Sequence, residues 1–193
     1  MVLQRYMKQF SMLVLFLVCT GMPASADTRF EAWVQAFKAE ARSQGIDATL
    51  LDRAFHGMTP LPKVLQLDRH QPESTITFEQ YRTRTVTRDR IRKGRALLAQ
   101  HRTLLQTISQ QYGVPPRFLV ALWGVETDYG RYTGKFHVLE ALASLAYDGR
   151  RSAYFRQELL DALAILQDGA IPLSMMKGSW AGAMGHVQFM PSS

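Results

Sequence analysis

The chain has 193 residues, of which 47% are hydrophobic and 20% are charged. These fractions are those of a globular protein and exclude a disordered or low-complexity chain. The formal net charge of +7 suits an anionic polymer partner, whether a cell-wall glycan, a nucleic acid or a lipid surface, and suits a plain solvated surface equally well.

The first 26 residues have the pattern of a secretory signal peptide. Arg5 and Lys8 form a basic start, residues 10–20 are almost wholly apolar, and an Ala-Ser-Ala run ends at Ala26. The apolar run is shorter than the roughly 20 residues that a membrane span needs. We therefore expect cleavage after Ala26, export to the periplasm and a mature chain of residues 27–193.

The single cysteine, Cys19, lies inside this leader, so the mature chain has no thiol and no disulfide. Lipidation of Cys19 would make the protein an outer-membrane lipoprotein and attach it to a membrane. Val18, which precedes the cysteine, fits a lipidation site poorly. A soluble periplasmic protein is the main expectation, and a lipoprotein or a retained N-terminal anchor is the alternative.

The mature sequence shows helical apolar spacing and no convincing two-residue alternation, so we expect an all-α fold without strands. Asp47 is the expected N-cap of the second helix. The long charged third segment is read as one helix or as two that meet near Gly94, with its arginines on a solvated face. The expected helices span residues 30–41 (ended by Gly45), 48–55, 77–112, 116–129, 137–147 and 152–167.

Two stretches are expected to be non-helical. Pro60 and Pro62 break the chain after the second helix, and residues 68–74 read as an extended linker. The segment after Gly169 is expected to be a loop that continues to the end of the chain.

The expected helix that opens at Pro116 carries one carboxylate among apolar residues, because Glu126 falls between Leu119 and Leu122 around the helix axis. Burial disfavours the charged form of a carboxyl group and raises its pKa, as a general acid at neutral pH requires. A structural role is equally compatible with this position, with Glu126 capping a neighbouring helix or paired with an arginine such as Arg131 or Arg150.

Asp128 is the nearest second acid. Two residues farther along a helix, it points to the opposite side, so it and Glu126 cannot flank one bond. A lone carboxylate disfavours the usual two-carboxylate glycosidase. It favours a mechanism in which the substrate supplies its own nucleophile.

Residues 178–192 read as a loop suited to a ligand. Three glycines, at positions 178, 182 and 185, allow close backbone approach to a bound molecule. Ser179 and Gln188 offer hydrogen bonds to sugar hydroxyl or acetamide groups. Trp180 and Phe189 can stack on sugar rings or fill the core, and the core is the favoured interpretation for these aromatics.

No metal or cofactor is expected. The five histidines have no ligand spacing with Cys, Asp or Glu, and neither a phosphate-binding loop nor a serine-hydrolase elbow is present. A nucleic-acid partner rests on charge alone and is opposed by the signal peptide, so none is expected.

Three motifs in order carry a resemblance to a known family. The runs WGVETDYG at residues 123–130, ALASLAYD at 141–148 and the segment 178–192 resemble the membrane-bound lytic murein transglycosylase B family, glycoside hydrolase family 103. The likeness covers essentially all of residues 27–193. It implies a lysozyme-like helical fold and a periplasmic enzyme that cleaves the β-1,4 bond between N-acetylmuramic acid and N-acetylglucosamine with a 1,6-anhydro product.

The resemblance also implies roles for single residues. Glu126 falls on the family's catalytic glutamate, acting first as acid and then as base. Ser179 and Gln188 fall on positions that hold the sugars, and Met184 and Phe189 would line the groove. The implied partners are peptidoglycan glycan strands, with a cell-wall synthesis complex as a further candidate.

The chain departs from the family at its end, because family members continue well past Ser193. We therefore expect a lysozyme-like domain that is incomplete on its C-terminal side, with apolar faces such as that of residues 152–167 partly uncovered. The alternative to a lytic transglycosylase is a non-catalytic peptidoglycan-binding fragment of the same fold.

Overall fold

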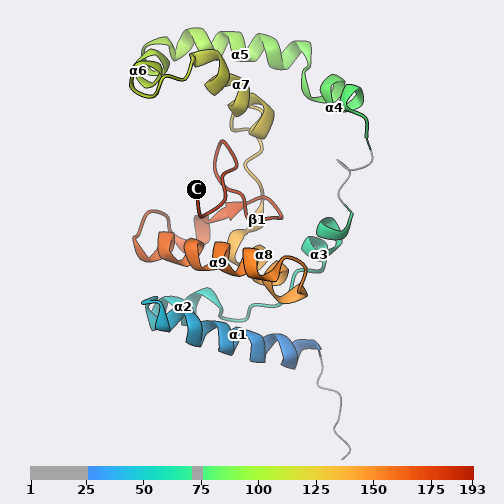
Figure 1. Cartoon of the computed structure of the whole chain (residues 1–193), viewed down its shortest axis with the longest axis vertical. Coiled ribbons are helices and arrows are strands. Elements are labelled where there is room, and N and C mark those ends of the chain that lie inside the picture. Colours follow the sequence, from blue (N-terminus) through green and yellow to red (C-terminus); the bar gives the residue numbers. More distant parts are fainter. Residues whose placement is uncertain (1–25, 71–75) are drawn as a thin grey trace, which may run out of the picture.

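A computed structural model describes residues 26–70 and 76–193 (Figure 1). The signal peptide, Cys19 and the expected linker beyond residue 70 lie outside the described residues. The helices are α1 Ala26–Ser43, α2 Ala48–Ala54, α3 Pro62–Arg69, α4 Phe78–Thr85, α5 Arg88–Gln100, α6 Arg102–Tyr112, α7 Pro116–Thr127, α8 Val138–Asp148 and α9 Ser152–Gln167. A 3-10 helix, Leu173–Met175, follows α9, and strand β1 Phe136–His137 pairs antiparallel with β2 Lys177–Gly178.

The all-α prediction is confirmed, apart from this small sheet. Local chemistry sets several helix ends as expected. The Leu50 amide donates to the side chain of Asp47 at the start of α2, and Gly113 ends α6 in the left-handed conformation with φ 71°.

Two sequence predictions about helix boundaries are wrong. Residues 62–69 form α3 rather than a break and the start of a linker, because Pro62 occupies the first helical turn, where proline is tolerated. The segment 77–112 forms three helices, and Gly94 lies inside α5. Thr87 caps the start of α5 and His101 separates α5 from α6, so neither break lies at a glycine.

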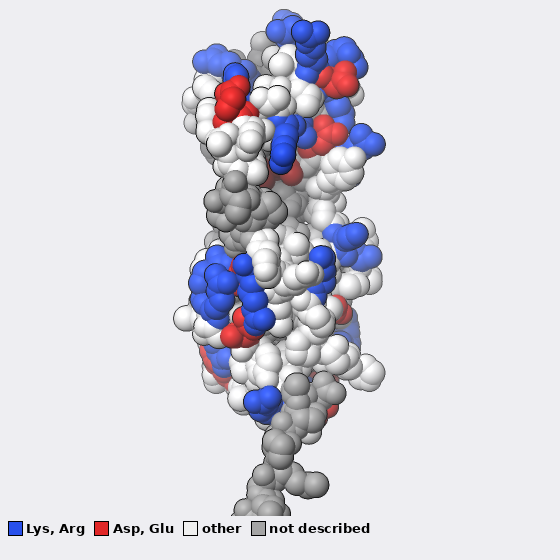
Figure 2. Space-filling model, turned by 90° about the vertical axis from the view of Figure 1, so that its right-hand side faces the viewer, with Lys and Arg blue, Asp and Glu red and all other residues white. Residues whose placement is uncertain are grey.

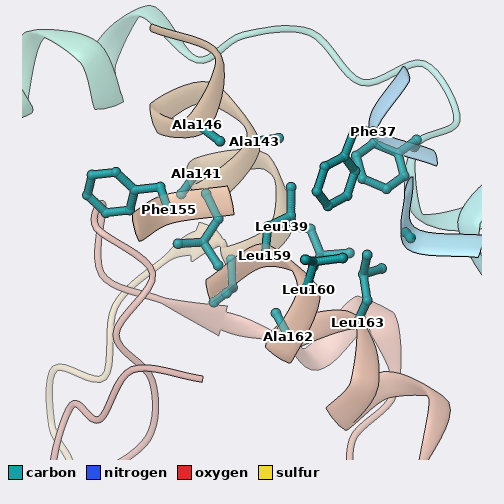
Figure 3. Packing of buried hydrophobic residues seen from close by; sticks show 14 of the residues in the cluster. Phe37, Leu139, Ala141, Ala143, Ala146, Phe155, Leu159, Leu160, Ala162 and Leu163 are labelled. Atoms are coloured by element: carbon teal, nitrogen blue, oxygen red, sulfur yellow. The ribbon is translucent and has the colours of Figure 1, made fainter. Parts of the chain in front are cut away.

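The helices form two groups, with the chain from residue 178 to the C-terminus lying between them (Figure 1). One group contains α1, α2, α3, α8 and α9 and holds the main hydrophobic core. Side chains from α1, α8 and α9 point into a shared space there, among them Phe37, Leu139 and Leu163 (Figure 3). The other group, α4 to α7, contains few buried residues.

The uncovered apolar faces are not where the sequence placed them. Helix α9 buries seven residues, so the expectation of an exposed face at residues 152–167 is wrong. Apolar side chains of α6 and α7 are exposed instead, namely Leu104 at 59%, Phe118 at 56%, Leu122 at 40% and Val125 at 42%. The apolar face of α9 is therefore buried against α8 in the core. The apolar faces of α6 and α7, by contrast, meet few other side chains among the described residues.

The basic excess gathers on the group of α4 to α7. Helices α4 and α5 together carry seven Lys or Arg residues and two acids, and Figure 2 shows blue side chains over the upper end of this face, where α4 and α5 lie in Figure 1. All seven except Arg90 are exposed, which agrees with a solvated face. No helix within residues 26–70 and 76–193 has the length and apolar character to cross a membrane.

Several ion pairs join elements of the core group, among them those of Asp68 and Lys38. The side chain of Asp68 in α3 is 1% exposed and lies 2.5 Å from Arg151 and 3.6 Å from Arg150, at the turn between α8 and α9. Lys38 of α1 donates to Asp52 of α2, and this hydrogen bond lowers the pKa of the Asp52 carboxyl.

Tyr129 joins α5 to α7. Its hydroxyl donates to the carbonyl oxygen of Arg90 at 2.8 Å, and its ring lies over Gly124 of α7 and Gly94 of α5, where any Cβ would collide with it. Burial raises the pKa of Tyr129, with a smaller contribution from the charge of Asp128. The two glycines are therefore required for close packing around one aromatic side chain.

We expect Leu142→Ala to lower the free energy of unfolding by about 2–5 kcal/mol, because Leu142 is fully buried in α8. The matched variant Leu104→Ala, on the exposed face of α6, should change it by about 0.5 kcal/mol or less. Urea denaturation of both variants measures the difference. Equal losses would contradict the placement of the core.

We expect Tyr129→Phe to lower stability at neutral pH by about 1 kcal/mol, because the hydrogen bond to Arg90 is lost. The pKa of Tyr129 is raised in the folded state, so its contribution is complete below about pH 10 and declines as the pH rises through the folded pKa. Denaturation at pH 7 and above pH 10 should show the gap between wild type and variant closing. A gap that widens at alkaline pH would contradict this sign.

Candidate active site

Glu126 is the penultimate residue of α7 and is exposed to solvent. The expectation that it is buried is therefore wrong. Its apolar neighbours Leu122 and Val125 are themselves about two-fifths exposed, because no described element covers this side of α7. The helical periodicity correctly placed Glu126 among apolar residues. It could not indicate whether another element packs against that face of the helix.

The structure does not support a purely structural ion pair for Glu126. Arg131 lies 3.9 Å from Asp128, and Arg150 lies 3.6 Å from Asp68. Among the residues that the structure describes, Glu126 takes part in no hydrogen bond or ion pair. Its carboxylate is free to meet a ligand.

The chain leaves α7 through two consecutive non-glycine residues in the left-handed region, Asp128 with φ 51° and Tyr129 with φ 63°. The Asp128 carboxylate lies 3.5 Å from Arg90 and 3.9 Å from Lys93, both on α5. Asp128 thus holds α5 to the end of α7, and Glu126 remains a lone acid, as the sequence predicted.

Thr127 connects α7 to the C-terminal segment. Its side chain is 1% exposed. The hydroxyl donates to the carbonyl oxygen of His186 at 2.7 Å and accepts from the amide of Gly130 at 2.9 Å. The residue directly after Glu126 therefore fixes the position of the segment that carries Gln188.

Ser179 sits at a turn that follows β2. Its Oγ accepts from the amides of Ala181 at 3.3 Å and Ala183 at 3.1 Å. These bonds use the acceptor capacity of the oxygen and leave its proton available for donation. Ser179 is therefore placed to donate a hydrogen bond to a ligand.

Gln188 has a left-handed backbone, with φ 51°. Its amide nitrogen donates to the carbonyl oxygens of Thr133 at 3.1 Å and Gly185 at 2.9 Å. These contacts hold the side chain against the loop that follows α7. The amide oxygen has no protein partner within the described chain, and it remains available as an acceptor.

Two of the three glycines in residues 178–192 are required by tight packing, whereas the sequence predicted that all three allow the close approach of a ligand. A Cβ on Gly182 would collide with Leu142 of α8, and one on Gly178 would collide with the carbonyl oxygen of Ala183. A Cβ on Gly185 would meet open space. Of these three glycines, only Gly185 has the open surroundings that close approach of a ligand requires.

The two predicted groove-lining residues differ in environment. Met184 is partly buried and packs against the core, and it forms backbone bridges to Gly178 and Phe189. Phe189 is 55% exposed, which contradicts the core interpretation, and it lines an apolar cleft of about 450 Å³ together with Leu122 and Trp123. Glu126 follows Trp123 by three residues on the same helix and so lies near one end of this cleft.

A second cleft, of about 530 Å³, contains Ser179 and Trp180. Trp180 is partly buried and packs against the core, as the sequence favoured. The cleft is also lined by Arg131, Tyr132 and Lys135, which the sequence reasoning missed. Their signal was an aromatic residue and a base between Gly130 and Gly134, with a second base directly after Gly134.

His186, whose role the sequence left open, stacks on the ring of Trp123 with centroids 5.6 Å apart. No group of three or more His, Cys, Asp or Glu side chains within residues 26–70 and 76–193 is placed to hold a metal ion. The absence of a metal requirement remains a prediction.

We expect Gly134→Ala to destabilise the protein more than Gly149→Ala, by about 1–3 kcal/mol. Both glycines have positive φ, 95° and 91°, and so share the backbone cost of a side chain. Only at Gly134 would the new methyl group overlap the backbone of Gly178 beside Ser179, whereas at Gly149 it meets open space. Urea denaturation gives the difference, and equal effects would show that Gly178 moves aside freely.

Comparison with known proteins assigns the chain to a family. Residues 29–193 match the sequence profile of the transglycosylase SLT domain. The chain is 36% identical over 159 residues to membrane-bound lytic murein transglycosylase B of Escherichia coli (strain K12), a match that covers 77% of this chain and 44% of the relative.

Solved structures agree with this match. SltB3 from Pseudomonas aeruginosa, in complex with NAG-NAM-pentapeptide, is 46% identical with a TM-score of 0.80, over 84% of this chain and 44% of that chain. The Escherichia coli lytic transglycosylase Slt35, in complex with bulgecin A, is 36% identical with a TM-score of 0.73, over 82% and 52%. The chain thus spans about half the length of these relatives, and it belongs to the transglycosylase SLT domain family, with the fold of the lytic transglycosylases.

Proposed function

We propose that this chain is the glutamate-bearing part of a lytic murein transglycosylase. Its substrate would be the β-1,4 bond between N-acetylmuramic acid and N-acetylglucosamine in peptidoglycan. The observation that carries the proposal is a solvent-accessible Glu126 whose neighbour Thr127 is hydrogen-bonded to the segment that carries Gln188. The relative SltB3 was solved with NAG-NAM-pentapeptide and with NAG-anhNAM-pentapeptide, which supports this substrate and an anhydro product.

In the proposed reaction, Glu126 acts twice. Its protonated carboxyl group gives a proton to the glycosidic oxygen, and the bond from that oxygen to C1 of the muramyl residue breaks while the substrate's acetamide stabilises C1. The carboxylate then takes the proton of the 6-hydroxyl, whose oxygen bonds to C1. The product is a 1,6-anhydro sugar, Glu126 is protonated again, and no water is consumed.

The exposure of Glu126 has a consequence for this mechanism. In the described residues its carboxyl group is open to solvent. A sugar seated on the apolar surface near Leu122, Trp123 and Phe189 would exclude water from the reacting groups. Substrate binding would thus complete the surroundings of the acid.

Polar contacts would orient the glycan. The Ser179 hydroxyl is available as a donor and the Gln188 amide oxygen as an acceptor, and together they suit hydroxyl or acetamide groups. Met184 and Phe189 would line the groove. Arg131 and Lys135, beside Ser179, suit the carboxylates of peptidoglycan. Export to the periplasm through cleavage of residues 1–26 would bring the chain to this substrate.

A second candidate is a peptidoglycan-binding fragment without catalysis. The exposed Glu126 and the exposed apolar faces of α6 and α7 favour it, because the described residues do not enclose the surroundings of this acid. This candidate predicts binding to sacculi without release of soluble products.

Incubation of purified sacculi with residues 27–193 and with the Glu126→Gln variant separates the two. We expect the wild type to release anhydromuropeptides, and the variant to release them about 10²–10⁴-fold more slowly, because the amide cannot transfer the proton. Mass spectrometry identifies the products, and sedimentation with sacculi measures binding.

Soluble products heavier by one water would indicate hydrolysis and contradict the transglycosylase mechanism. Binding by both proteins without products would favour the non-catalytic candidate. Equal product release by wild type and variant would exclude Glu126 as the acid.

A further inference from the structure

The segment from His186 to Ser192, here called the site segment, is held at both ends by buried polar side chains. At its start, the carbonyl oxygen of His186 accepts from Thr127. At its end, the amide and hydroxyl of Ser192 donate to the two carboxylate oxygens of Glu158, at 3.0 and 2.8 Å. Thr127 and Glu158 are 1% and 2% exposed. Gln188 and Phe189 lie between these two anchors.

Glu158 has an unusual environment for a carboxylate. It lies in α9 among residues of the hydrophobic core, and no Lys, Arg or His in the described parts of the chain pairs with it. The two donors of Ser192 compensate it, and a side-chain hydrogen bond with Tyr154 adds to them. Burial of a carboxylate is unfavourable without such bonds. If position 158 served only the packing of α9, an apolar residue there would stabilise the core more than a glutamate.

The backbone around Glu126 and in the site segment is strained. Four described non-glycine residues have positive φ, namely Asp128, Tyr129, Arg151 and Gln188. Two of these follow Thr127 directly, and Gln188 lies inside the site segment. Such conformations are energetically unfavourable and persist where surrounding contacts enforce them. The contacts of Thr127 and Glu158 are well placed to supply that constraint.

We propose that Thr127 and Glu158 are positioning residues. They hold the strained site segment so that the Gln188 oxygen and the Phe189 ring keep a fixed place relative to Glu126. Thr127 acts from the helix of the acid itself, and Glu158 acts from the core. The inference rests on the proposed function for its catalytic consequence, whereas the constraint on the segment holds independently of any activity.

The test compares variants of the full chain that differ by one group. Thr127→Val removes the hydroxyl at nearly constant volume, and Thr127→Ser retains it. Glu158→Met removes both acceptors of Ser192 at similar side-chain length. Ser144→Ala is the control for the loss of a buried hydroxyl elsewhere, because Ser144 is fully buried and bonds Leu61 and Glu140.

Two readouts are needed. Hydrogen exchange by mass spectrometry on residues 184–193 reports the holding of the segment without requiring activity. We expect about tenfold faster exchange there, or more, in Thr127→Val and Glu158→Met, because each loses at least one hydrogen bond, and wild-type exchange in Thr127→Ser and Ser144→Ala. The rate of anhydromuropeptide release from sacculi should fall about 10–100-fold in the first two variants, since small displacements of aligned groups are costly to catalysis, and should be restored in Thr127→Ser.

Segment exchange in Thr127→Val and Glu158→Met that equals that of Ser144→Ala would overturn the proposal. Faster exchange with an unchanged rate would show that the segment is held but does not position the reacting groups, and would overturn its catalytic part. If the wild type releases no anhydromuropeptides, the proposed function fails, and hydrogen exchange alone then decides whether the two residues hold the segment.

Discussion

The fold depends on one helix that is apolar on nearly every side. In α8, every residue from Val138 to Ala146 except Glu140 is buried. A helix of this kind cannot lie at a surface and must be surrounded. Helix α9 packs along it, α1 to α3 cover another side, and Gly178 and Gly182 bring the C-terminal segment against Val138 and Leu142. The position of Ser179 is thereby set by hydrophobic packing.

The candidate site combines two supports of different kinds. The part of the site that contains Ser179 packs against α8 in the hydrophobic core. Glu126 lies at the end of α7, in a group of helices that has few buried residues. Contacts across this division include the hydrogen bonds from Thr127 to His186 and from Gln188 to Thr133, beside the stacking of His186 on Trp123. Hydrogen bonds are directional, so they define the relative placement of the two sides more closely than apolar contact would.

The electrostatics of the site follow from this division. Asp128 is surrounded by bases that neutralise it, and Glu126 is left as a solvated carboxylate beside apolar side chains. The apolar cleft near Phe189 and the basic cleft beside Ser179 lie on different elements, so an extended glycan with anionic side groups suits them better than a compact ligand.

The sequence by itself determined the helical class, most helix ends and the lone acid. These depend on local signals, such as the Asp47 cap, Gly113 in the left-handed region and the 3.6-residue apolar period. The motifs also predicted Ser179 and Gln188 as members of one site, and this stays a prediction. Only the tertiary structure decided that Glu126 is exposed, that α9 is covered and that Thr127 and Glu158 anchor the same segment. Periodicity shows which face of a helix is apolar, but burial and long-range hydrogen bonds depend on what packs against that face.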